Sequence, residues 1–417
     1  GNAGSDSLRL WPNRGKLVGN NYAVTAATVE KINVHGGGGT DVAKLYGNPA
    51  TPDTLEAFPD SARFHGPAFD HQVFSYRYLH AFATAGGGDV ARLYGRLGGQ
   101  DTLEAMPEAT RLYGDGFFTR AVDFDQVSSH GNQGDVDVAR LYDDPLAADA
   151  FDATPEVASF IGAGFDNQAH GFRYVHAIAT EGSGDVATLH DDPTARDYYK
   201  AAPEVARLYG GAFFTRVLRF DQVLAHGTPA SGDVAILHDD PGRPDNLSAT
   251  PDSVAYTGVG FDNQAHHFRY VHAYGTRGDN DVAALHGDPS RPDLYKAFPR
   301  YARLYADTYF QRVLTFDHVL AYGSSDPADV AYLYDDPAGK DVFDATPEVA
   351  SIVGTGFDNQ AHGFPYVHAY STSGSGDEAR LHDDPLRRDT FKATPNKAVL
   401  DGAGFFNRAL AFDTVYA

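Results

Sequence analysis

The chain has 417 residues and a formal charge of −23 at pH 7, from 33 Lys and Arg against 56 Asp and Glu. So acidic a protein is a poor partner for nucleic acid or an anionic membrane surface, and no stretch approaches the ~20 apolar residues of a membrane-spanning helix. A hydrophobic content of 42% argues against disorder. The lack of Cys and the single Met suit a protein that meets oxygen, so we expect an extracellular or cell-surface location.

One pattern, Asp-Val-Ala or a close variant, restarts every 48 residues, at Asp41, Asp89, Asp137, Asp185, Asp233, Asp281, Asp329 and Asp377. A fixed period without insertions is typical of stacked supersecondary units. We therefore expect eight tandem repeats over 41–417 in one continuous array, preceded by a partial repeat over 1–40. Because the array begins and stops inside a unit, we also expect a longer parent array.

The elements of one repeat can be predicted from their apolar spacing. Alternating Ala and Leu predict a strand over 138–142, which ends at the turn 143–145. A second strand follows Asp149 and stops before Pro155, because Pro cannot donate to a strand ladder. A third strand contains Ala206 and Leu208, and the segment 213–226 is predicted to bend near Arg219, where the apolar spacing changes from two to three.

The fold class predicted from these elements is all-β, because no segment shows a helical apolar stripe with caps. Two architectures fit strands at a regular period: a parallel β-helix or β-solenoid built from 48-residue units, and an eight-bladed β-propeller. The solenoid is favoured, since a partial copy precedes eight nearly complete ones. Each unit would then form two coils of ~24 residues or one coil of 48.

Successive copies alternate between two types, so the full sequence period is 96 residues. The alternating columns are Asp70, Asp166, Asp262 and Asp358 against Phe118, Phe214, Phe310 and Phe406; Gln72, Gln168, Gln264 and Gln360 against Arg120, Arg216, Arg312 and Arg408; and Arg77, Arg173 and Arg269 against Asp125, Asp221, Asp317 and Asp413. If neighbouring copies stack in register, the last column would form cross-strand ion pairs. Alternatively, the alternation reflects a 96-residue duplication without such contacts.

Three copies carry a carboxylate followed by two imidazoles, the residue types that bind a transition metal. The candidate metal ligands are Asp166, His170 and His176; Asp262, His266 and His272; and Asp358, His362 and His368. The alternative is that these side chains form hydrogen-bonded ladders on a solvated sheet face.

The Asp-rich turns offer carboxylates to a hard cation, and Ca²⁺ is the predicted cofactor. The candidate ligands are Asp143, Asp144 and Asp149, and in the next copy Asp191, Asp192 and Asp197. The Gly-rich joint over 36–41 faintly resembles the repeats of calcium-binding β-rolls, although it lacks their nine-residue iteration. The simpler interpretation is that Asp at a turn caps backbone amides.

No catalytic residues stand out. His190, His238, His286 and His382 share a column with Tyr46, Tyr94, Tyr142 and Tyr334, and the exchange of His for Tyr suggests an amphipathic position instead of a catalytic base. An active site should break the repeat at one place, and no such break is evident. We therefore predict a non-enzymatic protein.

The unit Asp-Val-Ala-Arg-Leu-Tyr-Asp-Asp-Pro, followed by Asp-x-Phe-x-Ala-Thr-Pro, resembles the tandem repeats of giant bacterial surface or secreted proteins over almost the whole chain. The resemblance implies an extracellular structural scaffold that is adhesive or filament-forming and whose partner is itself or its parent array. A second hypothesis is a multivalent glycan-binding module that uses Tyr78, Tyr174, Tyr270 and Tyr366. A third is a β-helix enzyme acting on polysaccharides.

Overall fold

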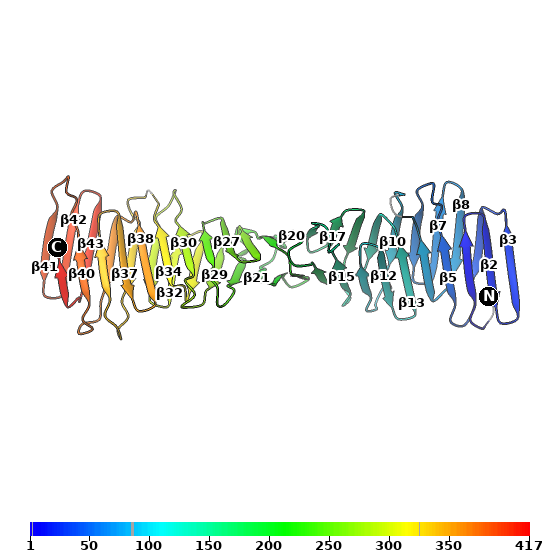
Figure 1. Ribbon diagram of the computed structural model, residues 1–417, viewed down its shortest axis with the longest axis horizontal. Coiled ribbons are helices and arrows are strands. Elements are labelled where there is room, and N and C mark those ends of the chain that lie inside the picture. The colour runs from blue at the N-terminus through cyan, green and yellow to red at the C-terminus, as the bar shows by residue number, and fades with distance from the viewer. Residues whose placement is uncertain (2, 85–86, 325) are drawn as a thin grey trace. The chain divides into compact units, whose positions relative to one another are not determined.

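The protein is described by a computed structural model over residues 1, 3–84, 87–324 and 326–417. It is an all-β protein, 55% strand, whose coils stack into a β-solenoid of about 11 turns (Figure 1). The predicted solenoid is therefore confirmed, and the alternative propeller is wrong. The helical content of the described residues is the 3₁₀ turn η1 (Pro229–Ser231), and nothing helical in this part of the chain could cross a bilayer.

The chain divides into two compact units. The first unit comprises Gly1–Asp192 and Arg207–Val223, and the second comprises Pro193–Ala206 and Leu224–Ala417. Each unit is built from the same repeat, so the features below are described within one unit at a time.

Within the described ranges the strands belong to two sheets of 23 and 21 strands, here called sheet A and sheet B. Sheet A contains β1 (Ser7–Trp11), β2 (Arg14–Gly19), β3 (Tyr22–Ala27), β5 (Val42–Tyr46), β9 (Tyr78–Phe82), β11 (Thr102–Ala105), β12 (Ala109–Gly114), β13 (Phe117–Val122), β15 (Val138–Tyr142), β19 (Tyr174–Ile178), β21 (Tyr198–Ala202), β22 (Val205–Tyr209), β23 (Phe214–Leu218), β25 (Val234–His238), β29 (Tyr270–Tyr274), β31 (Leu294–Phe298), β32 (Tyr301–Tyr305), β33 (Phe310–Leu314), β35 (Val330–Tyr334), β39 (Tyr366–Tyr370), β41 (Thr390–Thr394), β42 (Lys397–Gly402) and β43 (Phe405–Leu410). Sheet B contains β4 (Lys31–His35), β6 (Thr54–Phe58), β7 (Ser61–Gly66), β8 (Phe69–Phe74), β10 (Val90–Tyr94), β14 (Gln126–His130), β16 (Ala150–Ala153), β17 (Val157–Gly162), β18 (Phe165–His170), β20 (Val186–His190), β24 (Gln222–His226), β26 (Asn246–Ala249), β27 (Ser253–Gly258), β28 (Phe261–His266), β30 (Val282–His286), β34 (His318–Tyr322), β36 (Val342–Ala345), β37 (Val349–Gly354), β38 (Phe357–His362), β40 (Glu378–Leu381) and β44 (Thr414–Tyr416).

Each repeat supplies strands to both sheets. In the copy that starts at Asp89, β10 lies in sheet B, the antiparallel meander β11–β12–β13 lies in sheet A, and β14 returns to sheet B. In the next copy, β15 lies in sheet A, the meander β16–β17–β18 lies in sheet B, and β19 returns to sheet A. Successive copies therefore exchange sheets, which explains why equivalent residues on one sheet recur every 96 residues.

The length of one turn follows from the parallel pairs. Val90 of β10 pairs with Gln126 of β14, 36 residues later, and Gln126 pairs with Asp166 of β18, 40 residues later. The predicted coils of ~24 or 48 residues are therefore wrong. The reason is the antiparallel meander, which places three strands of one turn in the same sheet.

The strands predicted from apolar spacing are confirmed as β15, β16 and β22. The predicted bend is also confirmed: Arg219, between β23 and β24, has a φ of 60°, in the left-handed region. Along each strand, alternate side chains face the interior, so that Ala91 and Leu93 of β10 have exposed fractions of 0%. Burial of each such Leu contributes about 1.5–3 kcal/mol.

The alternating Arg and Asp columns lie beside different sheets, so the predicted cross-strand pairing of these columns is wrong. Arg173 precedes a strand of sheet A, whereas Asp125 and Asp221 precede strands of sheet B. Asp125 instead accepts hydrogen bonds from the amides of Gly88 and Asp89, at 2.7 and 2.9 Å. The structure thus favours the alternative interpretation, a 96-residue alternation without contact between these columns.

A column of buried aspartates, here called the Asp ladder, joins consecutive turns. Its members precede the first and second strands of each copy, at Asp41, Asp53, Asp89, Asp101, Asp137, Asp149, Asp185, Asp197, Asp233, Asp245, Asp281, Asp293, Asp329, Asp341 and Asp377. The amide of Asp101 donates to Oδ1 of Asp137 at 2.7 Å, and the amide of Asn132, five residues before Asp137, donates to Oδ2 at 2.8 Å. One carboxylate therefore binds the preceding turn and closes its own loop.

The second-strand aspartates approach the backbone closely. A Cβ on Gly162 would lie 2.1 Å from Oδ1 of Asp149, so only glycine fits there, and this buried Oδ1 has no hydrogen-bond donor. In the copy of Asp293, Ala306 takes the place of the glycine and Tyr309 replaces the usual Phe. The Tyr309 hydroxyl donates to Oδ1 of Asp293 at 2.7 Å, which satisfies the oxygen that the other copy leaves unpaired.

The Asp ladder predicts the effect of Asp137→Ala. The substitution leaves the amides of Asp101 and Asn132 without their acceptor, and each buried orphan donor costs about 1–3 kcal/mol. We expect the free energy of unfolding, measured by urea denaturation, to fall by about 2–6 kcal/mol.

The matched control is Asp115→Ala, which removes an exposed aspartate from a turn of the same unit and should change the unfolding free energy by less than about 0.5 kcal/mol. Equal effects of the two substitutions would show that the Asp137 carboxylate does not hold the turns together.

Candidate functional site

The first predicted calcium set lies in the turn after β15, where its carboxylates cap backbone amides. Asp149 accepts a hydrogen bond from the amide of Asp144 at 2.6 Å, and Asp144 accepts one from Leu146 at 3.1 Å. Oδ2 of Asp143 accepts a hydrogen bond from Thr180 at 2.6 Å. Each of these carboxylates thus already has a structural partner, as the capping interpretation expects.

The second predicted calcium set lies in the equivalent turn after β20. Asp197 has an exposed fraction of 0%, and its amide donates to Oδ1 of Asp233 at 2.7 Å as part of the Asp ladder. Asp191 and Asp192 occupy the turn itself. The one group of three carboxylates that the described residues bring within metal-binding distance is a different set, Asp239, Asp279 and Asp281.

The predicted transition-metal ligands are divided between the two sheets. Asp166 and His170 lie on β18 of sheet B, whereas His176 lies on β19 of sheet A. Nε2 of His170 lies 3.2 Å from Oε1 of Gln168, whose Nε2 donates to Asp166 at 3.0 Å. The same division separates Asp262 and His266 from His272, and Asp358 and His362 from His368. The structure thus brings together the first two members of each set and not the third.

Residues of the column in which His exchanges with Tyr stack against rings from other positions of the repeat. In the first unit, Phe58, Tyr94, His130 and His170 stack at centroid distances of 4.4, 4.8 and 4.7 Å. Only Tyr94 of these four belongs to the His/Tyr column; the other rings come from other positions of the repeat. Parallel stacking explains why His and Tyr replace one another in the column, since either flat ring can stack. It also leaves mainly ring edges exposed, so this column is poorly suited to stacking against sugars.

A row rich in Lys, Arg and His side chains, interrupted by Glu104 in the first unit and by Ile236, Tyr332 and Val399 in the second, crosses the outer side of sheet A. The sequence alone did not predict it as a site. In the first unit the paired residues of adjacent strands run, in order, Lys44, His80, Arg120, Arg111, Glu104, Arg140, His176 and Arg216. In the second unit the corresponding row runs Lys200, Ile236, His272, Arg312, Arg303, Lys296, Tyr332, His368, Arg408, Val399 and Lys392. We call these rows the basic column.

The basic column places like charges directly opposite one another. Arg111 pairs with Arg120, and Arg303 pairs with Arg312, arrangements in which like charges repel. Glu104 lies 3.5 Å from Arg111 and neutralises part of this charge in the first unit. The matching row on sheet B contains mainly uncharged side chains, such as Ser128, which pairs with Gln168. The signal was present in the sequence as the alternation of Arg120 with Gln168, but only the strand pairing shows that the cations gather on one sheet.

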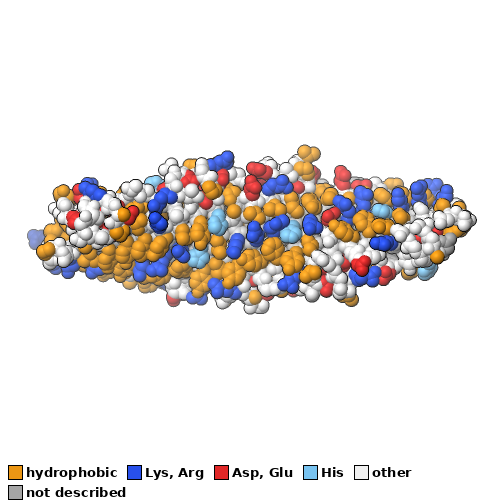
Figure 2. All heavy atoms as spheres, turned by 90° about the horizontal axis from the view of Figure 1, so that it is seen from below, with side chains coloured by type: hydrophobic (Ala, Val, Ile, Leu, Met, Phe, Trp, Pro, Cys, Tyr) orange, Lys and Arg blue, Asp and Glu red, His pale blue; other side chains and the backbone are white. Residues whose placement is uncertain are grey.

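Burial and neighbouring arginines lower the pKa of histidines in the basic column. Burial, followed by the charges of Arg216 and Arg140, lowers the pKa of His176 to about 4. Burial and then Arg408 lower the pKa of His368 to about 4 in the second unit. These histidines are therefore neutral at pH 7. Figure 2 shows a face of the molecule on which Lys, Arg and His side chains lie among hydrophobic ones.

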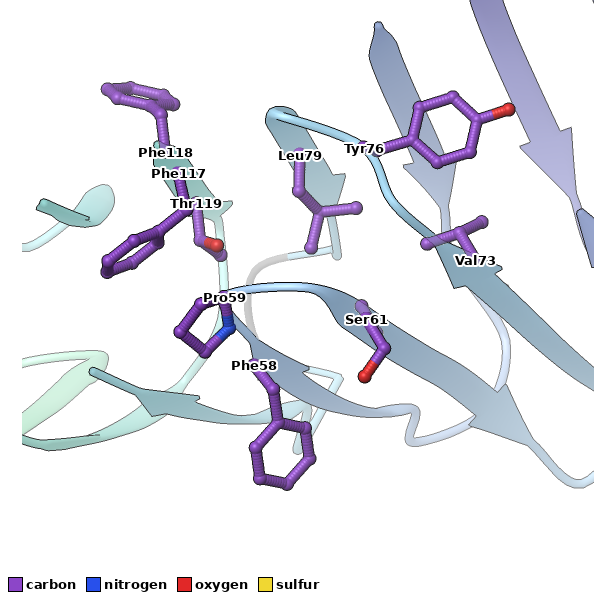
Figure 3. Close-up of a pocket in the computed structure, with 10 residues that line it drawn as sticks. Phe58, Pro59, Ser61, Val73, Tyr76, Leu79, Phe117, Phe118 and Thr119 are labelled. Carbon is purple, nitrogen blue, oxygen red and sulfur yellow. The ribbon is translucent and has the colours of Figure 1, made fainter. Parts of the chain in front are cut away.

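The cavities differ greatly in size. A cavity of about 10 Å³ lies among Phe58, Val73, Tyr76, Leu79 and Phe117 (Figure 3), which is room for no more than a water molecule. Two open grooves, of about 850 and 650 Å³, lie beside equivalent turns of the first and second units. Their repetition shows that they arise from the packing of the repeat.

No protein-family model and no curated protein matches the chain.

Proposed function

We propose that the chain is a non-enzymatic structural scaffold of an extracellular or cell-surface protein. The observation that carries this proposal is the Asp ladder, because the acidic residues that recur most regularly bind the backbone of adjacent turns. The carboxylate of Asp185, for example, accepts the amide of Asp149 at 2.7 Å and the hydroxyl of Ser183 at 2.5 Å. Residues engaged in this way serve the stability of the array and are not free to act on a substrate.

The scaffold proposal predicts resistance to proteolysis and no turnover of polysaccharides. Incubation of the whole chain with proteinase K at 37 °C should leave it largely intact, because buried, hydrogen-bonded strands must open before cleavage. A parallel assay for reducing ends should detect no release from a panel of neutral and acidic polysaccharides. Rapid cleavage throughout the chain, or sugar release abolished by one substitution, would contradict a structural role.

A second candidate function is the binding of acidic glycans, and the basic column is the observation that favours it. Opposed arginines such as Arg111 and Arg120 would be stabilised by a linear polymer that carries one carboxylate per sugar. Tyr174 lies on the same outer side of sheet A, and the guanidinium of Arg173 lies 5.7 Å from its ring centroid. Repeated weak contacts along successive strands would add affinity through multivalency.

Polygalacturonate is the probe that tests this second function. The double substitution Arg111→Gln and Arg120→Gln should weaken its binding several-fold, and binding by the parent chain should weaken as salt rises. The matched control is Ser128→Glu with Gln168→Glu on sheet B, which changes the net charge by the same amount and should have little effect. Affinity electrophoresis that shows equal retardation of both variants, or no retardation of the parent chain, would exclude the basic column as a glycan site.

A further inference from the structure

The carboxylates of Asp239, Asp279 and Asp281 gather in the second unit, with one oxygen from each within 4.8 Å of the others. Asp239 follows β25, whereas Asp279 and Asp281 precede β30. Asp239 and Asp281 are buried, with exposed fractions of 7% and 0%. Ca²⁺ binds oxygen ligands at about 2.3–2.6 Å, so two ligands on opposite sides of the ion lie about 5 Å apart. The three oxygens are therefore close enough to share one cation.

The repeat provides two sister sites, 96 residues before and after, that show how this position is normally satisfied. In the earlier site, the Ser183 hydroxyl donates to Asp185 at 2.5 Å and the Thr180 amide donates to Asp143 at 2.6 Å. In the later site, the Ser375 hydroxyl donates to Asp377 and the Thr372 amide donates to Asp335, both at 2.6 Å. In each sister site, two carboxylates thus meet a serine donor and an amide donor.

The middle site has Asp279 where the sister sites have Ser183 and Ser375. This exchange removes a donor and adds a third carboxylate. The Thr276 amide donates to Asp281 at 2.8 Å, in place of the bond that its counterparts make to Asp143 and Asp335. As a result, Oδ2 of Asp239 is buried without a hydrogen-bond partner. An unpaired carboxylate oxygen at this depth is costly unless a cation or a proton satisfies it.

The surroundings supply no basic side chain to neutralise the group. Among the residues that the structure describes, none of Asp239, Asp279 and Asp281 takes part in an ion pair. The nearby ion pair joins Arg243 to Asp240. The three carboxylates therefore lack a side-chain counter-charge within the described part of the chain.

We propose that Asp239, Asp279 and Asp281 form a binding site for a hard divalent cation, with Ca²⁺ as the ion that suits three carboxylates and flexible loop geometry. In the sister sites, serine and amide donors stabilise the carboxylates. In the middle site, the cation stabilises them. It ties the turn after β25 to the loop before β30, and thus joins consecutive turns of the second unit at one place in the array. This inference is independent of the scaffold and glycan proposals.

Isothermal titration of the chelator-treated whole chain with CaCl₂ at pH 7.5 tests the proposal. The parent chain should bind one Ca²⁺, and Asp279→Ser, which recreates the sister sites, should lose that binding. The same titration with MgCl₂ shows which hard cation is preferred, and Mg²⁺ binding that depends on Asp279 also supports the site. Because the sister sites fold with serine at this position, Asp279→Ser should retain the strand content of the parent chain by circular dichroism.

The converse variant provides a gain-of-function control. Ser183→Asp places a third carboxylate beside Asp143 and Asp185, and should create a second Ca²⁺ site in the first unit. Ca²⁺ should also raise the thermal unfolding temperature of the parent chain but not that of Asp279→Ser. Equal cation binding by the parent chain and Asp279→Ser, or binding of neither Ca²⁺ nor Mg²⁺ by the parent chain, would overturn the proposal and assign a proton to the group instead.

Discussion

The rest of the structure depends on the hydrogen bond from the amide of one ladder aspartate to the carboxylate of another, 36 residues later, as between Asp245 and Asp281 at 2.9 Å. Because the second oxygen binds an amide five residues before its own position, both the length of the turn and the length of the loop are fixed. An inserted residue would separate a buried carboxylate from both donors. This constraint explains why the 48-residue period has no insertions.

The sequence was sufficient to predict the fold class and the individual strands, because both are determined by local apolar alternation and by turn residues. It was insufficient to predict the size of a turn or the strand partners. Those depend on the meander, which carries the chain from β10 to β14 over 36 residues and exchanges sheets between copies. For the same reason Asp166 and His176, though close in sequence, lie on different sheets.

The candidate sites, too, depend on strand partners that the sequence alone does not reveal. The basic column is visible in the sequence only as an alternation of Arg with Gln, and strand pairing is needed to bring Arg111 opposite Arg120. We expected an active site to break the repeat at one place and found no such break. The proposed cation site rests on a smaller break, the single substitution of Asp279 for serine. Its importance follows from the donor that is lost and from the buried oxygen of Asp239.

Hydrogen exchange of backbone amides, read by mass spectrometry with fragmentation to single residues, tests the Asp ladder most directly. The amides of Asp149 and Asp245 precede their strands, so ordinary loop amides at such positions would exchange rapidly. The ladder predicts that both exchange as slowly as interior amides of β15 and β25, since each donates to a buried carboxylate. Exchange as fast as that of exposed loop amides without a hydrogen bond would contradict the claim that these carboxylates hold successive turns together.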